Sequence, residues 1–307
     1  MNDKYINSDK LVPIISSAMA LPAGRISDVQ PFNNIGIKTN QSYTFVSDGC
    51  KYMIRIPGKN TELLLNRKSE AAAYRAIQGT GISDDVVFLD PSSGIKISKF
   101  IAGSRECNPY SIDEVSRSLR LLRRFHEMRL ETAYTFDIFG HIQQYEQVNE
   151  ENSLYPDYEE TKECILKLRP YIDACAAPLC LSHIDAVPNN FLLFSSDGIE
   201  DIRLIDWEYA AMQDPHLDIV MFFLAYYKDM SLERLDFLIR SYFYDQGGCE
   251  ERIRVKLLCY TACCCLMWSN WAEYKIRQGF DYRRWSSYLY GNAKRFYELA
   301  MNFMPGV

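Results

Sequence analysis

The 307-residue sequence lacks a long hydrophobic run. Its longest apolar stretch, Leu257 to Trp268, has 12 residues, whereas a membrane-spanning helix needs about 20. This stretch therefore predicts a buried helix, and we expect no membrane insertion. The charged and apolar segments of a secretory signal are also missing from the start of the sequence, which favours a cytoplasmic protein.

Long runs of lysine or arginine are missing as well, and the formal net charge is −6. Proteins that bind nucleic acid generally need a concentrated basic surface to contact the phosphate backbone. We therefore expect no nucleic-acid partner. An acidic balance is compatible with a small cationic substrate.

Cysteine is plentiful, with ten residues, but no C-x-x-C pair stands beside a matching Cys or His pair, as a structural zinc site would require. Cys263, Cys264 and Cys265 are consecutive within the apolar stretch. They predict reduced core residues rather than disulfides. The remaining composition is that of an ordinary globular protein, and the length suffices for two lobes, each with its own core.

The clearest chemical pattern lies in the segment LSHIDAVPNNFLLFSSDGIEDIRLIDWEYA. Phe191 to Phe194 and Ile202 to Asp206 predict two short strands, and the Asp197-Gly198 pair between them is a strong turn signal. Such a hairpin would bring Asn190, just before the first strand, close to Asp206 at the end of the second.

The polar residues of this segment have the spacing H-x-D-x-x-x-x-N, followed by an aspartate on a strand: His183, Asp185, Asn190 and Asp206. Two oxygen ligands beside a separate carboxylate suit Mg²⁺, which uses few protein ligands. Kinases use the same arrangement for phosphoryl transfer: the first aspartate orients or accepts the hydroxyl proton, and the other two residues hold metal. A polar loop beside an ordinary hairpin is the alternative interpretation.

The first third of the chain has sequence patterns typical of β-strands. Ser42 to Ser47 and Cys50 to Ile56 flank an Asp48-Gly49 turn and predict a second hairpin. Before it, Asn34 to Asn40 forms a polar segment that could turn backbone N–H groups towards phosphate oxygens. With one glycine it is no phosphate motif by itself, and an ordinary loop leading into a hairpin is equally compatible. Residues 86–103 predict two more strands around a Pro-Ser-Ser-Gly turn.

The rest of the chain favours helices. Ser111 and Glu114 form a capping-box signal before a helical apolar pattern that ends at His126, which we interpret as a core residue. Residues 134–157 show little periodicity and predict a connection, and Tyr158 to Cys175 predict a helix. Asp218, near the start of a further apolar helix, is expected to support the catalytic loop.

The segments SHIDAVPNN and LIDWEYA resemble the two signature blocks of the choline/ethanolamine kinase family, a branch of the aminoglycoside phosphotransferase group with a protein-kinase-like fold. The resemblance extends from about Asn33 to Tyr297. It implies an α+β fold with two lobes: residues 1–100 as the nucleotide-binding lobe, with a small antiparallel sheet, and residues 101–307 as a mainly helical lobe carrying the catalytic loop and acceptor site.

The resemblance also implies roles for the central residues. Asp185 matches the catalytic aspartate, with Asn190 and His183 in the same catalytic segment and His183 interpreted as an organiser of the loop. Asn190 and Asp206 match the metal ligands. Glu208 is a nearby acidic residue that we include as a candidate for the metal.

On the nucleotide side, the resemblance places Thr39 and Asn40 in the nucleotide loop and Arg55 at the phosphate-binding cation, where this family commonly has arginine. Glu70 would be the helix partner of Arg55; its alternative interpretation is a solvated glutamate. The segment between the lobes would contact adenine. The candidates for nucleotide binding are Thr39, Asn40, Arg55, Glu70, Ser98, Phe100 and Ile101.

The acceptor site would lie in the last third, where Trp268, Trp271 and Trp285 resemble the choline-binding box of choline kinases. Aromatic faces bind a quaternary ammonium by cation–π attraction. Tyr226 is a further candidate, and its neighbour Ala225 departs from the family, because the animal enzymes have an acidic residue there. An aromatic stripe of this kind also fits an ordinary core.

We therefore predict an ATP-dependent kinase that transfers a phosphoryl group to choline with Mg²⁺, acting as a monomer or homodimer. Ethanolamine, an aminoglycoside or another amino alcohol is the alternative acceptor, although an aminoglycoside would favour several carboxylates at the acceptor site. A pseudokinase that binds nucleotide without turnover is a further alternative, which the presence of Asp185, Asn190 and Asp206 disfavours.

Overall fold

The computed structural model describes residues 8–32, 40–58, 61–149, 151–196 and 198–304. The chain forms two compact units. Unit 1 comprises the described residues of Met1–Arg105 and Leu193–Glu208, and unit 2 those of Glu106–Leu192 and Tyr209–Val307. The chain thus returns to unit 1 after Leu192. The division into 1–100 and 101–307 stays a prediction.

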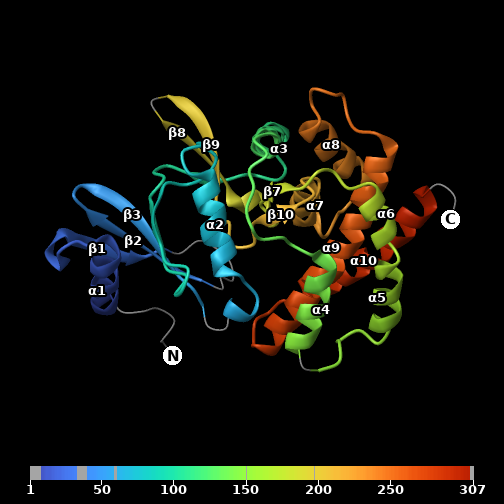
Figure 1. The fold of residues 1–307 in the computed structure, drawn as a ribbon, viewed down its shortest axis with the longest axis horizontal. Helices are drawn as coiled ribbons and strands as arrows, with labels where there is room; N and C mark the ends of the chain where they lie inside the picture. Colours follow the sequence, from blue (N-terminus) through green and yellow to red (C-terminus); the bar gives the residue numbers. More distant parts are fainter. Residues whose placement is uncertain (1–7, 33–39, 59–60, 150, 197, 305–307) are drawn as a thin grey trace. The chain divides into compact units, whose positions relative to one another are not determined.

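Unit 1 is built on a five-stranded sheet in the order β1-β2-β3-β5-β4, with every neighbouring pair antiparallel. Its strands are β1 (Ile26–Pro31), β2 (Gln41–Ser47), β3 (Cys50–Ile56), β4 (Val86–Leu89) and β5 (Lys96–Lys99). Strands β1, β2 and β3 are labelled in Figure 1. The predicted β2–β3 hairpin is confirmed, because Ser47 pairs with Cys50 across a two-residue turn. Asp48 and Gly49 both have positive φ, as such a turn requires.

The core of unit 1 lies between this sheet and the first helix, α1 (Ser8–Met19). Leu11 and Ile15, one turn apart on α1, are both fully buried. They pack with apolar side chains from four strands: Ile26, Tyr43, Phe45, Ile54 and Ile97. The cluster forms because alternate residues of each strand point to the same face.

Helix α2 (Arg67–Ile77) follows the short turn η2 (Thr61–Leu63). Its N-cap is Asn66, whose side-chain oxygen accepts hydrogen bonds from the N–H groups of Lys68 and Ser69. Glu70 and Tyr74, one turn apart, are both buried. The alternative interpretation of Glu70 as a solvated helix residue is therefore wrong.

A three-stranded sheet has the order β6-β8-β9, formed by β6 (Arg105–Glu106), β8 (Phe191–Ser196) and β9 (Ile199–Leu204). The second strand of the predicted hairpin ends at Leu204, two residues earlier than expected. Asp206 cannot continue the strand because its φ is +67°. Of the predicted turn pair, Asp197 lies outside the described residues, and Gly198 has φ +78°.

Unit 2 is mainly helical. Its helices are α3 (Ile112–Glu127), α4 (Ile138–Asn149), α5 (Tyr158–Leu166), α6 (Arg169–Ala174), α7 (Leu217–Phe223), α8 (Leu232–Tyr242), α9 (Glu251–Arg277) and α10 (Arg283–Phe303). Two short strands, β7 (Cys180–Ser182) and β10 (Ala211–Gln213), pair antiparallel. The predicted N-cap of α3 is confirmed, since Ser111 accepts from the Glu114 N–H, although the Glu114 carboxylate binds Asn108 N instead of closing a capping box.

Two predictions about this unit are wrong in detail. Residues 134–157 were expected to form a connection but contain α4, which is stabilised by packing its buried face against α9. The helix predicted over Tyr158 to Cys175 is divided into α5 and α6. Pro170 explains the division, because it has no N–H and its ring clashes with the carbonyl of the preceding turn.

The centre of unit 2 is α9, which contacts α4, α5, α6, α7 and α10 and runs beside α10 (Figure 1). Every residue from Val255 to Lys275 is buried, which confirms the buried helix predicted around Leu257 to Trp268. No helix in the described ranges is both long and apolar enough to cross a membrane. All ten cysteines are free, and Cys263, Cys264 and Cys265 are core residues of α9.

Candidate active site

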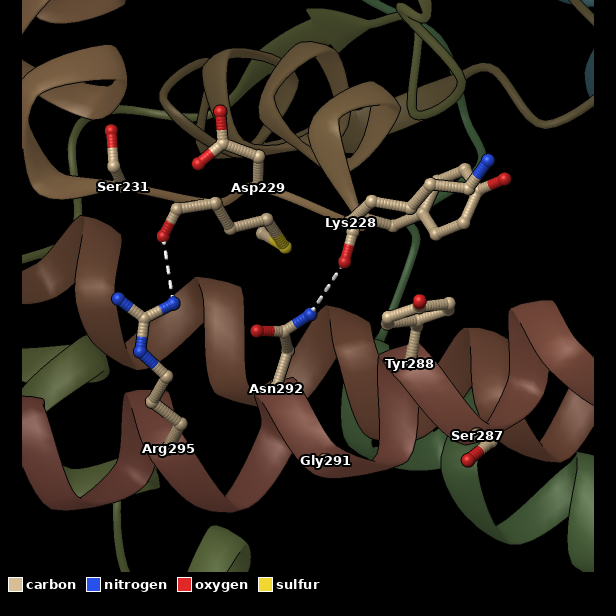
Figure 2. A pocket seen from close by; sticks show the side chains of 10 residues that line it. Lys228, Asp229, Ser231, Ser287, Tyr288, Gly291, Asn292 and Arg295 are labelled. Carbon is tan, nitrogen blue, oxygen red and sulfur yellow. Dashed lines mark hydrogen bonds between the residues drawn. The ribbon is translucent and has the colours of Figure 1, made fainter.

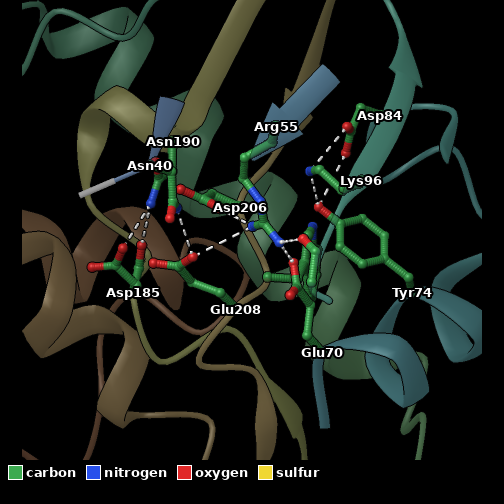
Figure 3. Close-up of polar contacts among 12 residues, drawn as sticks. Asn40, Arg55, Glu70, Tyr74, Asp84, Lys96, Asp185, Asn190, Asp206 and Glu208 are labelled. Carbon is green, nitrogen blue, oxygen red and sulfur yellow. Dashed lines mark hydrogen bonds and ion pairs between the residues drawn. The ribbon is translucent and has the colours of Figure 1, made fainter. Parts of the chain in front are cut away.

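In unit 1, the guanidinium of Arg55 contacts three carboxylates (Figure 3). Its Nη2 atom lies 2.6 Å from Glu70 Oε1. Its Nη1 atom lies 3.1 Å from Asp206 Oδ1 and 3.4 Å from Glu208 Oε2. Burial alone would lower the pKa of Arg55, but the nearby carboxylates outweigh it and hold the pKa above its ordinary value. Arg55 is therefore a permanent cation that joins β3 to α2 and to the segment after β9.

Glu208 has a strongly raised pKa. Burial raises its pKa to about 8, Asp206 adds to the rise, and Arg55 opposes it. Its Oε2 atom accepts a hydrogen bond of 3.0 Å from Asn40 Nδ2, while Asn40 Oδ1 accepts from Gly58 N. With its pKa near 8, Glu208 is mostly protonated at neutral pH, so Glu70 and Asp206 are the two negative charges that face the single positive charge of Arg55. A cation bound beside Glu208 would favour its ionised form and compensate the remaining negative charge.

A second buried cation, Lys96, pairs directly opposite Arg55 in the β3–β5 register. Its Nζ donates to the Tyr74 hydroxyl at 2.5 Å and lies 3.4 Å from Asp84 Oδ2 (Figure 3). Helix α2 is thus tied to the sheet twice, by Glu70 on Arg55 and by Tyr74 on Lys96. Sequence reasoning missed Lys96 and Asp84; the available signal was a lysine inside the strand KISK.

The remaining nucleotide candidates lie around the end of β5. Ser98 is buried in that strand. Phe100 donates its N–H to Lys51 O at 3.0 Å, and the Lys51 ammonium lies 4.5 Å from its ring centroid. Ile101 accepts a long hydrogen bond from Ser104 N. Adenine binding here stays a prediction, and Thr39 lies outside the described residues.

In unit 2, the loop after β7 carries Asp185 and Asn190. The Asn190 amide nitrogen donates to the Asp185 side chain at 3.0 Å and to the Asp185 carbonyl at 2.8 Å (Figure 3). These bonds restrict the Asp185 side chain and leave the Asn190 amide oxygen as the atom that could bind a cation. The two residues are joined through η3 (Pro188–Asn190), a short 3₁₀ turn.

His183 is fully buried, and its Nδ1 accepts a hydrogen bond of 3.3 Å from the Asp185 N–H. A ring nitrogen that accepts a backbone hydrogen bond carries no proton. This geometry fits the predicted role of His183 as an organiser of the loop.

Ile184, between them, has φ +67°. A β-branched residue in the left-handed region is a genuine outlier, at a cost of about 1–3 kcal/mol. The strain is held by Asp218, at the start of α7: its two carboxylate oxygens accept from His183 N and Ile184 N at 2.7 Å each. Asp218 therefore supports the loop that carries Asp185, as the sequence predicts.

The tryptophans predicted for the acceptor site lie together in unit 2. Ring centroids are 5.7 Å apart for Trp268 and Trp271 and 6.0 Å apart for Trp271 and Trp285. Two tyrosines that sequence reasoning missed join them: Tyr209 lies 5.3 Å from Trp268, and Tyr282 lies 5.3 Å from Trp271. We call these five residues the aromatic cluster. Tyr209 lies within the signature block LIDWEYA, and this position was the available sequence signal.

Both indole N–H groups of Trp268 and Trp271 are buried, and neither finds a hydrogen-bond partner in the part of the chain that is described. Buried donors of this kind are uncommon and need an explanation such as a bound molecule or water. The side chain of Lys275 lies against the aromatic cluster. It is 2% exposed, and its ammonium is 5.4 Å from the Trp271 ring centroid. One face of the cluster therefore already contacts a cation.

Tyr226 belongs to a different group of contacts. Its hydroxyl donates to the carbonyl of Pro109, and Arg234 lies 4.8 Å from its ring. Its other aromatic neighbours are Tyr110 and Phe223. The structure thus does not place Tyr226 against the tryptophans, and Ala225 beside it brings no charge.

A separate pocket of about 370 Å³ lies between α10 and the segment Tyr227–Ser231. Figure 2 shows Asn292 and Arg295 on α10 donating to backbone carbonyls of that segment. None of the predicted site residues lines it.

The donors of the predicted metal site suit Mg²⁺ chemically. Asn190 offers an amide oxygen, and Asp206 offers a carboxylate that is about a third exposed. Hard oxygen donors of this kind, few in number, are what Mg²⁺ takes from proteins when nucleotide phosphates supply the rest. Asp206, together with the oxygens of its neighbour Glu208, offers the same type of donor.

The sequence matches the family model described as choline/ethanolamine kinase over residues 35–246. Protein LicA from Haemophilus influenzae is 27% identical over 271 residues, spanning 82% of this chain and 75% of that protein. A probable ethanolamine kinase from Arabidopsis thaliana is 25% identical over 258 residues, spanning 75% of this chain and 68% of that protein.

Among solved structures, the choline kinase LicA from Streptococcus pneumoniae superposes with a TM-score of 0.79 at 24% identity, covering 95% of this chain and 99% of that one. At this identity the likeness shows the fold. The predicted α+β, kinase-like fold is confirmed.

Proposed function

The chain belongs to the choline/ethanolamine kinase family and is a phosphotransferase that acts on an alcohol group; on this premise we propose that its acceptor is choline, which it converts to phosphocholine with ATP. The observation that carries the choice of choline is the aromatic cluster. A quaternary ammonium cannot donate hydrogen bonds, so it is recognised by aromatic faces, at about 2 kcal/mol or more per desolvated contact.

For the chemistry, we propose that Asp185 accepts or orients the proton of the acceptor hydroxyl. The two hydrogen bonds from Asn190 Nδ2 support this role, because they restrict the carboxylate before the acceptor arrives. His183 keeps the loop in shape and does not act as a base. Most of the rate enhancement then comes from positioning and charge neutralisation, as expected for phosphoryl transfer.

Mg²⁺ is the proposed metal, held by the Asn190 amide oxygen and the Asp206 carboxylate, with Glu208 as an additional acidic neighbour. When bound, it would neutralise negative charge on the nucleotide phosphates. Arg55 would contact the same phosphates from β3, and Glu70 fixes its direction. Asn40, Thr39, Ser98, Phe100 and Ile101 complete the proposed nucleotide contacts.

Ethanolamine is the second candidate acceptor, because the Arabidopsis relative is described as a probable ethanolamine kinase. A primary ammonium donates hydrogen bonds and favours carboxylate partners over aromatic faces alone. Loss of the Trp271 ring should therefore lower kcat/KM for choline more than kcat/KM for ethanolamine.

The test is an acceptor panel of choline, dimethylethanolamine and ethanolamine, assayed with MgATP by direct detection of the phosphorylated product. We expect kcat/KM to be highest for choline. Asp185→Asn should lower kcat by about 10²–10⁴-fold, the usual worth of a positioned proton acceptor. Equal turnover of wild type and Asp185→Asn would remove Asp185 from the mechanism.

Trp271→Leu and Trp271→Phe form a matched pair for the acceptor. Loss of the ring should reduce the choline-to-ethanolamine ratio of kcat/KM by roughly tenfold or more, whereas phenylalanine should preserve much of it. If both variants lose stability while the ratio stays constant, Trp271 is an ordinary core residue and the choice of choline loses its support.

A further inference from the structure

The backbone just before Asp185 is held in an unfavourable conformation by a carboxylate. Ile184 has φ +67°, whereas a β-branched residue favours an extended or helical backbone, so its conformation has to be held by contacts. Asp218 fixes the Ile184 N–H together with the preceding N–H of His183, using one carboxylate oxygen for each. The direction in which Asp185 leaves the loop therefore depends on the position of the Asp218 carboxylate.

The Asp218 carboxylate is itself held by His126, at the end of α3. His126 Nε2 lies 3.0 Å from Asp218 Oδ2, the same oxygen that accepts from His183 N. A carboxylate only accepts, so Nε2 carries the proton of this bond. Both side chains are almost fully buried, and a hydrogen bond in such low-dielectric surroundings is stronger than one in water.

The other ring nitrogen of His126 has an equally defined partner. Nδ1 lies 2.7 Å from the hydroxyl of Tyr242, the last residue of α8. Burial raises the pKa of Tyr242, so the hydroxyl keeps its proton and can donate it to Nδ1. The imidazole is thereby fixed between two helix ends, with one edge towards α8 and the other towards Asp218.

We infer that His126 is a positioning residue of the phosphotransferase: with Tyr242 behind it, it orients the Asp218 carboxylate that holds the Ile184 conformation and so presents Asp185. His126 does not touch the substrate and transfers no proton. The inference rests on the catalytic role proposed for Asp185, but the contacts that carry it lie wholly within unit 2.

The first measurement does not depend on activity. Amide hydrogen exchange of a peptide spanning residues 181–187 should be accelerated in His126→Ala and, to a smaller degree, in Tyr242→Phe, because both loosen the carboxylate that binds two of its N–H groups. His141→Ala is the matched control: His141 is also a histidine of unit 2, but its ring stacks on Phe136 and its Nδ1 lies 2.8 Å from the Asp137 carbonyl oxygen. It should leave exchange of this peptide unchanged.

The second measurement is a double-mutant cycle in kcat. His126→Ala should lower kcat by about 10–100-fold with little change in the nucleotide KM, since small displacements of a catalytic group have effects of this size. In an Asp218→Asn background, the same change should have little further effect. His141→Ala should keep wild-type kcat.

These readouts separate the possible failures. Unchanged exchange in both His126→Ala and Tyr242→Phe, or effects of His126→Ala and Asp218→Asn that simply multiply, would overturn the positioning role. If the wild type phosphorylates neither choline nor ethanolamine, the proposed acceptor fails, and the exchange experiment still decides the role of His126. Tyr242→Phe keeps the test meaningful if His126→Ala does not fold, because it removes a single hydroxyl.

Discussion

At the scale of single residues, the use of arginine at position 55 has a structural reason. A lysine ammonium is a point charge, whereas the planar guanidinium presents a fork of donors. Arg55 uses both terminal nitrogens, Nη2 towards Glu70 and Nη1 towards Asp206 and Glu208. A single guanidinium group therefore links α2 to the two carboxylates that follow β9. We expect this connection to keep Arg55 oriented when nucleotide is absent.

His216 gives a prediction about pH and stability. Burial lowers its pKa to about 4 from the ordinary 6.5, with Asp214 opposing the shift and Lys256 adding to it. The unfolded chain therefore binds a proton at higher pH than the folded protein. This contribution to stability is fully present above pH 6.5 and is lost as pH falls towards 4, by about 3 kcal/mol in total.

The measurement is the free energy of unfolding of wild type and His216→Gln between pH 4 and 8. Glutamine does not titrate, so the difference between the two proteins should shrink as the pH falls below 6.5. Other carboxylates titrate in both proteins and cancel in the difference. Parallel curves over the whole range would show that His216 is not held neutral.

At the scale of elements, the turn between β4 and β5 contributes directly to the candidate site. The Gly94 carbonyl accepts from Arg55 Nη2 at 3.4 Å. Gly94 has φ +75°, and a Cβ there would lie 2.8 Å from both Arg67 Nε and Pro57 Cγ. Glycine is thus required at this turn both for its backbone conformation and for the space it leaves.

We predict that Gly94→Ala destabilises the protein by about 2–4 kcal/mol, the sum of the left-handed penalty and the overpacking cost. Gly103→Ala is the control, because Gly103 has φ +68° but open space where a Cβ would lie. It should lose only the conformational part, about 1–2 kcal/mol. Equal losses in urea unfolding of the two variants would show that the contacts with Arg67 and Pro57 have no energetic weight.

The elements also show what the sequence could and could not predict. The catalytic loop was predictable because Asp185, Asn190 and the hairpin after them are close in the chain, so local spacing describes them. The β2–β3 hairpin was predictable because Asp48-Gly49 specifies its own turn. Helix α4 was missed, since its weak pattern is stabilised by α9, more than 100 residues away.

Contacts between segments that are distant in the sequence explain why the other site residues were missed or misplaced by sequence reasoning. Lys96 meets Tyr74, and Tyr209 meets Trp268, only after folding. His126 was interpreted as a core residue, which its burial supports, but its bond to Asp218 spans 92 positions and has no local signal. Tyr226 was predicted from its proximity to Ala225 in the sequence, and the structure places it with Tyr110 and Arg234 instead.

At the scale of the whole molecule, the distribution of cysteines gives a test of the buried core. Cys50 is exposed, whereas Cys263, Cys264 and Cys265 are fully buried in α9. Burial also raises the pKa of Cys259, to about 12, so little reactive thiolate exists there at neutral pH. Reactivity towards thiol reagents should therefore differ strongly along the chain.

We predict that a thiol reagent at pH 8 labels Cys50 rapidly in the native protein and labels Cys263, Cys264 and Cys265 only after denaturation. Mass spectrometry of digested protein at successive times measures each site. Cys50→Ser is the control and should remove the rapid labelling at position 50. Rapid labelling of the α9 cysteines in the absence of denaturant would contradict the packing of unit 2.

The return of the chain to unit 1 after Leu192 determines when unit 1 can finish folding during synthesis. Unit 1 contains bonds from its first part to residues far downstream: Leu204 N donates to Ile82 O, and Arg55 and Asn40 contact Asp206 and Glu208. When only residues 1–105 have left the ribosome, the sheet strands of unit 1 up to β5 are present. Arg55 then still lacks its contacts with Asp206 and Glu208. Unit 1 can be completed only after Glu208 has left the exit tunnel, so a gene cut after residue 105 would yield a first fragment that lacks part of its own unit.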